Sequence, residues 1–374
     1  MIKKIFGYNI EIKSDEPNSV LYKKLIESLK YYDESSENDI DIEINLFKKN
    51  KFNFKEYKLI NPKIYYYDNN KTAICLSDKI IEKKLLKNKL CINIYLEYNT
   101  PKTIFNFLRK IISYEFKYSS ENFPQFFYEM ILIPMMCFEK ERALIHCSSI
   151  ACNNKVIFLG GTGGVGKTST LIELGREKKV SFVCDDILVI DKENFYENYA
   201  YPKIYAYNTI GDKKLEYDIL KREGILSKIH WITKKKINPA KVRRKILPEE
   251  FYKIKDFNKK NLNKIYIILS RGNYEKMQLK SLEKNSAKEI TKHIILTEYK
   301  KYIEIVNYEI INKILYDGHT NGDNFNHGLE NWNNIYDHFF KNTDTYVLEI
   351  PKEIDHSIFK QNMKNILEQF FERN

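Results

Sequence analysis

The chain of 374 residues has no long uninterrupted run of apolar residues. A helix that crosses a bilayer needs about 20 such residues, and the longest candidate, Met130–Cys137, falls well short of that length. The chain begins Met-Ile-Lys-Lys-Ile-Phe, which lacks the apolar segment and the small-residue cleavage site of a secretory signal peptide. We therefore expect a cytoplasmic protein with no membrane partner.

Cysteines are few, and no two of them form a CxxC motif. Because zinc sites and disulfide frameworks place cysteines at short and regular spacings, this pattern argues against both. Most of the cysteines stand in apolar runs, so we expect buried free thiols in a reducing compartment. The six cysteines are Cys75, Cys91, Cys137, Cys147, Cys152 and Cys184.

Arginine is scarce as well, since the chain has 8 arginines and 54 lysines. The net charge of +12 suggests nucleic acid, but the lysines are spread along the chain and form no clear binding footprint. The densest basic region comprises Lys234–Lys236 and the pair Arg243-Arg244. Three interpretations are open for this region: a solvated surface, a contact to phosphate or to an acidic substrate, or a nucleic-acid contact.

The first 140 residues read as an α+β region. Short runs rich in Ile, Tyr and Val are separated by polar clusters that contain Asn, Asp and Pro, a pattern typical of strands and their turns. We expect helices over Leu21–Tyr32, from Thr100-Pro101 onward, and over Pro124–Glu139. The expected strands are Lys3–Lys13, Asp39–Phe47, Lys63–Tyr67, Ala73–Leu76 and Cys91–Tyr98.

Residues 141–374 differ in character and predict an α/β domain. An apolar run is followed by the glycine-rich stretch Gly160–Lys167, by a helical pattern up to Gly175, and by two further apolar runs, so the segment reads as strand, loop, helix, strand. A loop is expected over Asp317–Asn326, either as a surface excursion or as a lid over the site. The expected strands are Lys155–Leu159, Val180–Val183, Ile187–Ile190, Lys264–Leu269 and Tyr346–Ile350, and the later helices are Ala287–Thr297 and His356–Glu372.

The glycine-rich loop carries the complete nucleotide-binding motif G-x-x-x-x-G-K-[ST]. Its glycines allow a tight turn whose N–H groups point at phosphate oxygens, and the helix that follows adds partial positive charge from its N-terminus. Lys167 can reach the β- and γ-phosphates, and the Thr168 hydroxyl can bind Mg²⁺. The residues expected to hold the nucleotide are Gly161, Thr162, Gly163, Gly164, Val165, Gly166, Lys167, Thr168 and Ser169.

Asp185 and Asp186 follow an apolar strand downstream of this loop. Two adjacent carboxylates at a buried strand end are costly unless something compensates them, and Mg²⁺ and a catalytic proton would do so. One aspartate is enough for the metal in most ATPases and GTPases, so the second suggests a base for an acceptor hydroxyl. A turn cap or a lysine partner is the structural alternative. His146 stands just before the strand that leads into the loop, where a catalytic role competes with a structural one.

His146, the loop Gly161–Thr168 and the pair Asp185-Asp186, in this order and spacing, resemble the catalytic domain of HPr kinase/phosphorylase, which is itself similar to phosphoenolpyruvate carboxykinase. Most of the resemblance lies in Ala143–Ile190. The segment looks closer still to the HPr-kinase-like tailoring kinases found beside peptide-modification genes. Those kinases have an "LHxSxV" strand, a helix that ends in Gly, an acidic pair and a Tyr-Pro segment. The counterparts here are Leu144–Ile150, Gly175, Asp185-Asp186 and Tyr201-Pro202.

The resemblance implies a role for each matched residue. Lys167 would hold the β- and γ-phosphates, and Thr168 and Asp186 would bind Mg²⁺. Asp185 would take the proton of the acceptor. His146 would lie near the transferring phosphate and would either orient Asp185 or stabilise charge.

The chain also departs from the HPr kinases. The E-x-R-G-x-G signature after the acidic pair is missing, and residues 1–140 do not suggest the N-terminal domain of those bifunctional enzymes. HPr itself and the reverse phosphorylase reaction are therefore not implied. The expected fold is an α/β P-loop domain of the HPr kinase/PEP carboxykinase type over residues 141–374, with an N-terminal α+β region.

We expect an ATP-dependent kinase that uses Mg²⁺ and transfers the γ-phosphoryl group to a hydroxyl of a peptide, a protein or a small molecule. Two alternatives are a nucleotide-gated module for peptide binding or assembly, and an NTPase or kinase directed at nucleic acid. No nucleic-acid-binding module is apparent, and formation of a homo-oligomer is left open. Arg243 or Arg244, and Arg271 after a strand, are further candidates for contact with phosphate or an acidic acceptor, because arginine matches such groups.

Overall fold

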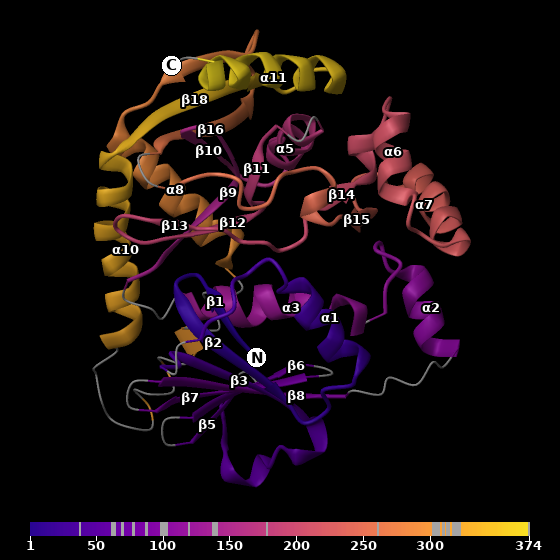
Figure 1. The fold of residues 1–374 in the computed structure, drawn as a ribbon, viewed down its shortest axis with the longest axis vertical. Helices are drawn as coiled ribbons and strands as arrows, with labels where there is room; N and C mark the ends of the chain where they lie inside the picture. Colours follow the sequence, from indigo (N-terminus) through magenta and orange to yellow (C-terminus); the bar gives the residue numbers. More distant parts are fainter. Residues whose placement is uncertain are drawn as a thin grey trace. The chain divides into compact units, whose positions relative to one another are not determined.

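The computed structural model describes residues 1–36, 39–60, 65–68, 71–76, 79–86, 89–97, 104–118, 120–136, 141–176, 179–259, 262–300, 307–308, 311, 315 and 323–372. The chain forms two compact units, whose elements Figure 1 labels. The first unit comprises Met1–Phe107, Tyr118–Lys140 and Lys301–Leu329. The second comprises Leu108–Lys117, Glu141–Lys300 and Glu330–Asn374.

The first unit contains one eight-stranded sheet with the order β1-β2-β3-β8-β7-β6-β5-β4. β3 pairs in parallel with β2 and β8, and the other neighbours are antiparallel. Every second residue of β8 is buried, so one face of the sheet supplies the core of this unit. The strands are β1 (Ile2–Ile5), β2 (Tyr8–Ser14), β3 (Ile42–Lys48), β4 (Lys58–Ile60), β5 (Tyr65–Asp68), β6 (Lys71–Leu76), β7 (Lys79–Leu86) and β8 (Lys89–Leu96).

The single strand expected over Lys3–Lys13 is wrong. Phe6 and Gly7 both have positive φ and reverse the chain in a two-residue turn between β1 and β2. β7 is absent from the expected strands because its charged residues interrupt the apolar pattern.

The helices expected in the first 140 residues are confirmed, with shorter bounds. Ser19 caps the first of them through its side chain. Thr100 and Pro101 lie outside the described residues. Two of the helices, α1 and α3, contact each other and lie on one side of the first sheet (Figure 1). The helical elements are α1 (Val20–Ser28), α2 (Ile104–Ile112), and the continuous run α3 (Phe123–Phe127), η4 (Tyr128–Leu132) and α4 (Ile133–Met136).

The second unit contains a mixed sheet with the order β13-β12-β9-β10-β16-β18-β17, and β11 pairs with β9. β16 is parallel to β10 and β18, whereas β9 is antiparallel to β10, β11 and β12. The α/β character expected for this part of the chain is therefore present. The strands are β9 (Ala143–Cys152), β10 (Lys155–Gly160), β11 (Ser181–Cys184), β12 (Ile187–Ile190), β13 (Phe195–Tyr196), β16 (Asn263–Gly272), β17 (Gln278–Ser281) and β18 (Thr343–Pro351).

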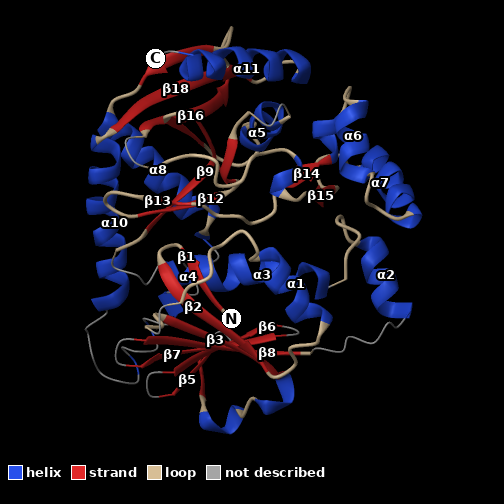
Figure 2. Cartoon of the chain, viewed as in Figure 1, coloured by secondary structure: helices blue, strands red, loops and turns tan. Residues whose placement is uncertain are grey.

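Helices cover both faces of this sheet (Figure 2). On one face, Tyr266 of β16 contacts Thr291 of α8 and Phe340 of α10. Tyr346 of β18 pairs with the next residue of β16, so it points to the other face, where it packs against Phe370 of α11. The result is a sheet buried between two helical layers. The helices are α5 (Lys167–Gly175), α8 (Lys284–Glu298), α10 (Asp323–Lys341) and α11 (His356–Glu372).

The loop expected over Asp317–Asn326 is wrong in its second half, because the residues from Asp323 onward begin α10. Residues 317–322 lie outside the described residues. α10 and α11 are long but carry polar residues throughout. Within the described ranges, no helix combines the length and the apolarity that crossing a membrane requires.

A two-stranded ribbon of β14 (Lys203–Tyr205) and β15 (Arg243–Lys245) forms a separate small sheet. The basic region seen in the sequence divides between this ribbon and the last turn of α7, where lysines are favoured by the partial negative charge of the helix C-terminus. Between the two strands the chain forms η5 (Ala206–Thr209), α6 (Lys213–Leu220) and α7 (Ile225–Ile237).

Candidate active site

The glycine-rich loop joins the end of β10 to the start of α5. Gly164 and Gly166 have φ of +81° and +110°, a region that residues with a side chain rarely adopt. A Cβ on Gly166 would also lie 2.4 Å from the Phe359 ring of α11, whereas one on Gly164 would meet nothing within 4 Å. Thr162 and Gly163, at the tip of the loop, are exposed.

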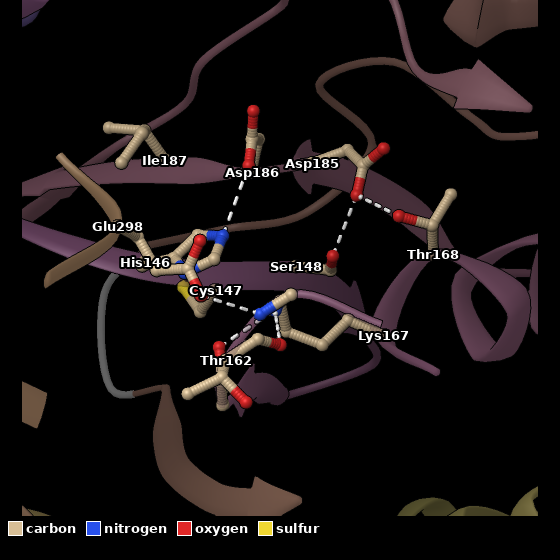
Figure 3. A network of polar contacts seen from close by, with 12 residues as sticks. His146, Cys147, Ser148, Thr162, Lys167, Thr168, Asp185, Asp186, Ile187 and Glu298 are labelled. Atoms are coloured by element: carbon tan, nitrogen blue, oxygen red, sulfur yellow. Dashed lines mark hydrogen bonds and ion pairs between the residues drawn. The ribbon is translucent and has the colours of Figure 1, made fainter. Parts of the chain in front are cut away.

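Lys167 is folded back onto this loop. Its ammonium donates hydrogen bonds to the carbonyl oxygens of Gly161 and Thr162, at 2.7 and 2.8 Å (Figure 3). Burial lowers the pKa of Lys167, while Asp186 and Asp185 act in the opposite direction. Phosphate oxygens carry more negative charge than carbonyl oxygens, so they are the stronger partners for this ammonium.

A carboxylate stands at the mouth of the loop. Glu298, the last residue of α8, accepts a hydrogen bond from the Gly163 N–H at 2.7 Å. Backbone N–H groups in loops of this kind bind phosphate oxygens, so the Glu298 oxygen lies where a phosphate oxygen would be held. The adjacent Tyr299 packs edge-to-face against His146, with ring centroids 5.9 Å apart.

Asp185 is held by two hydroxyl groups. Ser148 of β9 and Thr168 of α5 both donate to its Oδ1, at 2.7 and 2.9 Å (Figure 3). Asp185 is 8% exposed and Ser148 is fully buried. Burial raises the pKa of Asp185, and the charge of Asp186 adds to this effect, whereas the two hydroxyl donors oppose it.

Asp186 has a different set of partners. His146 Nε2 lies 3.1 Å from its Oδ1, and Lys203 Nζ lies 3.9 Å from its Oδ2. Its φ of +94° is unusual for a non-glycine residue, and such strain is concentrated at functional sites. The side chain is 48% exposed. Burial acts to raise the pKa of Asp186, but the hydrogen bond with His146 and the charge of Lys203 prevail and lower it to about 2.

The structure brings five predicted site residues into one network but pairs two of them differently from the expected roles. Thr168 bonds Asp185 and not Asp186, which was its expected partner on the metal. His146 contacts Asp186, whereas the expectation was that it either orients Asp185 or stabilises charge. The five residues are His146, Lys167, Thr168, Asp185 and Asp186.

Ser169, expected at the nucleotide, is turned elsewhere. It is 2% exposed, and its hydroxyl accepts a hydrogen bond from Asn208 of η5 at 2.6 Å. Since it follows Thr168 on a helix, its side chain leaves the helix in another direction. The structure therefore does not support a nucleotide contact by the Ser169 hydroxyl.

The arginine hypotheses have different outcomes. Arg244 is 1% exposed, lies over the Trp231 ring and donates to the carbonyl oxygen of Ser227, so the structure does not support its contact with phosphate or an acidic acceptor. Arg271 lies over the Phe359 ring, 5.9 Å from its centroid. Arg243 donates to Glu115 at 2.5 Å and keeps a partly exposed guanidinium.

Three polar residues of the site were not predicted from the sequence. Ser148 occupies the Ser position of the "LHxSxV" strand, so the resemblance contained a signal for it. Lys203 directly follows the Tyr-Pro segment, but nothing local marks its approach to Asp186. Glu298 is 135 residues away from Gly163, and no motif surrounds it.

The five described cysteines are free thiols. Cys147 and Cys184 are buried on neighbouring strands, with sulfur atoms 4.0 Å apart, and burial raises the pKa of Cys184 well above its ordinary value. Cys75, Cys91 and Cys152 are only half-buried. The expectation of buried thiols therefore holds for two of the five.

A hydroxyl beside a carboxylate fits a nucleotide-bound magnesium ion. Over the described parts of the chain, no group of three or more His, Cys, Asp or Glu side chains is placed to hold a metal. Mg²⁺ usually takes one or two protein ligands and completes its shell with phosphate oxygens and water, and Thr168 with Asp185 offers such a pair.

No family model and no curated protein matches this chain. The resemblance of Ala143–Ile190 to the HPr kinases therefore rests on its motif residues.

Proposed function

We propose that this protein is an ATP-dependent kinase of the HPr-kinase-like type, which transfers the γ-phosphoryl group to a hydroxyl of a peptide, a protein or a small molecule. The observation that carries the proposal is the hydrogen bond from Thr168 to Asp185, because it joins the glycine-rich loop to the acidic strand end. Such a loop alone fits any nucleotide-binding module. Two adjacent carboxylates with separate partners beside it fit phosphoryl transfer to an acceptor.

The loop and Lys167 serve the nucleotide in this proposal. Loop N–H groups hold phosphate oxygens, and the Lys167 ammonium exchanges its carbonyl partners for phosphate. Mg²⁺, when bound with ATP, neutralises phosphate charge and polarises the transferring group, and Thr168 and Asp185 would hold it. Because Thr168 bonds Asp185, we assign Asp185 to the metal side, in place of the role that the resemblance implies for it.

Asp186 is assigned to the acceptor side. Its carboxylate is far more exposed than that of Asp185, so an acceptor hydroxyl can reach it. As the acceptor oxygen bonds to the γ-phosphorus and the bond to the ADP oxygen breaks, Asp186 accepts the hydroxyl proton and His146 fixes the carboxylate. The hydrogen bond with His146 and the charge of Lys203 lower the pKa of Asp186 to about 2, so its carboxylate is ionised and has a free oxygen lone pair for the proton.

The test is transfer of label from γ-labelled ATP, with Mg²⁺, to pools of peptides and of cell metabolites. We expect wild-type protein to label an acceptor. Asp186→Asn should lower kcat by about 10²- to 10⁴-fold, the usual contribution of a positioned acid or base. Asp185→Asn should instead raise the Mg²⁺ concentration needed for half-maximal rate. Asp218→Asn, in α6, is the matched control and should match the wild type.

Other outcomes would contradict this assignment. Tight nucleotide binding without label in any pool would make the nucleotide-gated binding module the better description. ATP hydrolysis that depends on added nucleic acid and weakens with salt would favour an NTPase or kinase directed at nucleic acid. Equal effects of the two aspartate variants on Mg²⁺ dependence and on kcat would refute the division of roles between Asp185 and Asp186.

A further inference from the structure

One face of the β14–β15 ribbon carries three cations. Lys203 pairs directly with Lys245 across the ribbon, and Tyr205 pairs with Arg243. Because side chains alternate along a strand, these four share one face, and the buried Arg244 lies on the other. We call Lys203, Arg243 and Lys245 the cationic face.

The cationic face surrounds a buried carboxylate. Glu115 accepts a hydrogen bond from Arg243 Nε at 2.5 Å and lies 3.3 Å from Lys245 Nζ. The side chains of Glu115 and Lys245 are 9% and 8% exposed. Lys117 adds a further positive charge that acts on Lys245. Arg243 and Lys245 thus contact Glu115, while Lys203, the cross-strand neighbour of Lys245, approaches Asp186.

The like charges within this arrangement are unfavourable for the fold. Like charges directly opposite each other on neighbouring strands are destabilising, and burial of a charged group costs free energy even when it is paired. Burial lowers the pKa of Lys245 to about 8, and Lys117 and Lys203 contribute in the same direction against the opposing effect of Glu115. Unfavourable charge that is retained beside a candidate active site indicates a binding role.

We infer that the cationic face binds an anionic group of the acceptor, so that the substrate carries a carboxylate or a phosphate close to its reacting hydroxyl. The inference rests on the proposed kinase function and deepens it. Lys203 connects the cationic face with the acidic pair, because its ammonium is 3.9 Å from Asp186 Oδ2 and its cross-strand neighbour is Lys245. An anion held between these lysines places a hydroxyl a few bonds away at Asp186.

The partly exposed groups make the site accessible. The side chains of Lys203 and Arg243 are 22% and 31% exposed, and a guanidinium can donate two parallel hydrogen bonds to a carboxylate or phosphate. The bound anion would also relieve the repulsion between Lys203 and Lys245. Neutral alcohols and water lack the anion, so this face would discriminate against them and against simple ATP hydrolysis.

Anion binding is measured first because it does not depend on phosphoryl transfer. The loop is saturated with Mg²⁺ and a non-hydrolysable ATP analogue, and malonate or methyl phosphate is titrated while acetylation of Lys203 by limiting acetic anhydride is followed by mass spectrometry. We expect roughly fivefold protection at an anion concentration about four times its Kd, no protection of the exposed Lys213, and loss of protection in Lys245→Met.

The two anions separate the two acceptor chemistries. Protection by malonate alone assigns a carboxylate, and protection by methyl phosphate alone assigns a phosphate. If neither anion protects Lys203, with or without nucleotide, the inference is overturned. The titration without nucleotide gives this answer even for a protein that fails to bind ATP.

Transfer kinetics then distinguish failure of the inference from failure of the kinase function. For the acceptor that wild-type protein labels, Lys203→Met should raise KM by about 10- to 100-fold, the range for loss of a charged hydrogen bond, with a smaller change in kcat. Lys213→Met is the control and should leave KM unchanged. An unchanged KM in Lys203→Met overturns the inference but leaves the proposed kinase function intact. Protection of Lys203 by anions without any labelled acceptor supports the anion site and counts against the kinase function.

Discussion

Removal of the Glu298 carboxylate is expected to tighten nucleotide binding. This carboxylate accepts a hydrogen bond from the Gly163 N–H at 2.7 Å, in the place that a phosphate oxygen would take. A nucleotide bound at this loop would therefore have to displace Glu298 and then tolerate its negative charge nearby. Glu298→Ala removes both the competition and the repulsion, while Glu298→Gln keeps an acceptor oxygen and removes only the charge.

The size of the effect follows from the exposure of this contact. A hydrogen bond to a charged group is typically worth about 1.5–3 kcal/mol, but Glu298 and Gly163 are both exposed, so we discount the contact to about 1 kcal/mol. Repulsion between unit charges at about 4 Å in water adds up to about 1 kcal/mol. Together these terms predict that Glu298→Ala lowers the Kd of the nucleotide by roughly 5- to 30-fold, with Glu298→Gln between it and the wild type.

The assay is calorimetric titration with a magnesium complex of a non-hydrolysable ATP analogue. Glu289→Ala, on the same helix α8, is the matched control and should bind as the wild type does. The gain in Glu298→Ala should shrink at high salt, because exposed charges are screened. A Kd for Glu298→Ala within about twofold of the wild-type value, or a weaker one, would refute the view that Glu298 competes with phosphate.

Two further predictions concern the loop and the ribbon. Gly164→Ala should lower the free energy of unfolding by about 1 kcal/mol because of backbone strain. Gly166→Ala should lower it by about 3 kcal/mol, because its Cβ also meets the Phe359 ring. Equal losses of stability in urea unfolding would show that the ring moves aside. Lys245 has a folded-state pKa of about 8 against an ordinary 10.5, so the unfolded chain holds the proton that the folded protein releases between these values, and stability rises with pH across this window. Lys245→Met should remove this rise, which is about 3 kcal/mol over the whole window, measured by denaturation at its two ends, and a rise of the same size in the variant would contradict the assignment.

Elements with a strong local pattern were predictable from the sequence. The bounds of α11 agree with the expectation His356–Glu372, because its apolar residues recur at helical spacing. α7 was not predicted, although Ile225, Ile229 and Ile232 recur at helical spacing. In the structure these isoleucines are exposed while His230 and Trp231 are buried, so the buried face of α7 is not the one that this apolar spacing marks.

The partners of the two site carboxylates could not be predicted from the sequence, for a different reason. Asp185 and Asp186 are adjacent, so a pattern cannot tell which carboxylate meets which partner. That choice follows from the pairing of β11 and β12 with β9 and from the positive φ of Asp186. The contact of Glu298 with Gly163 likewise depends on tertiary structure alone.

The extended strand β9 sets the distance between the two halves of the site. His146 and Ser148 stand two residues apart on it, so their side chains leave the same face at a repeat of about 6.8 Å. One anchors Asp186 and the other anchors Asp185. A one-residue insertion between them would turn one anchor to the opposite face and break a single carboxylate contact. The pleat of β9 thus fixes the separation of the two side chains that anchor Asp185 and Asp186.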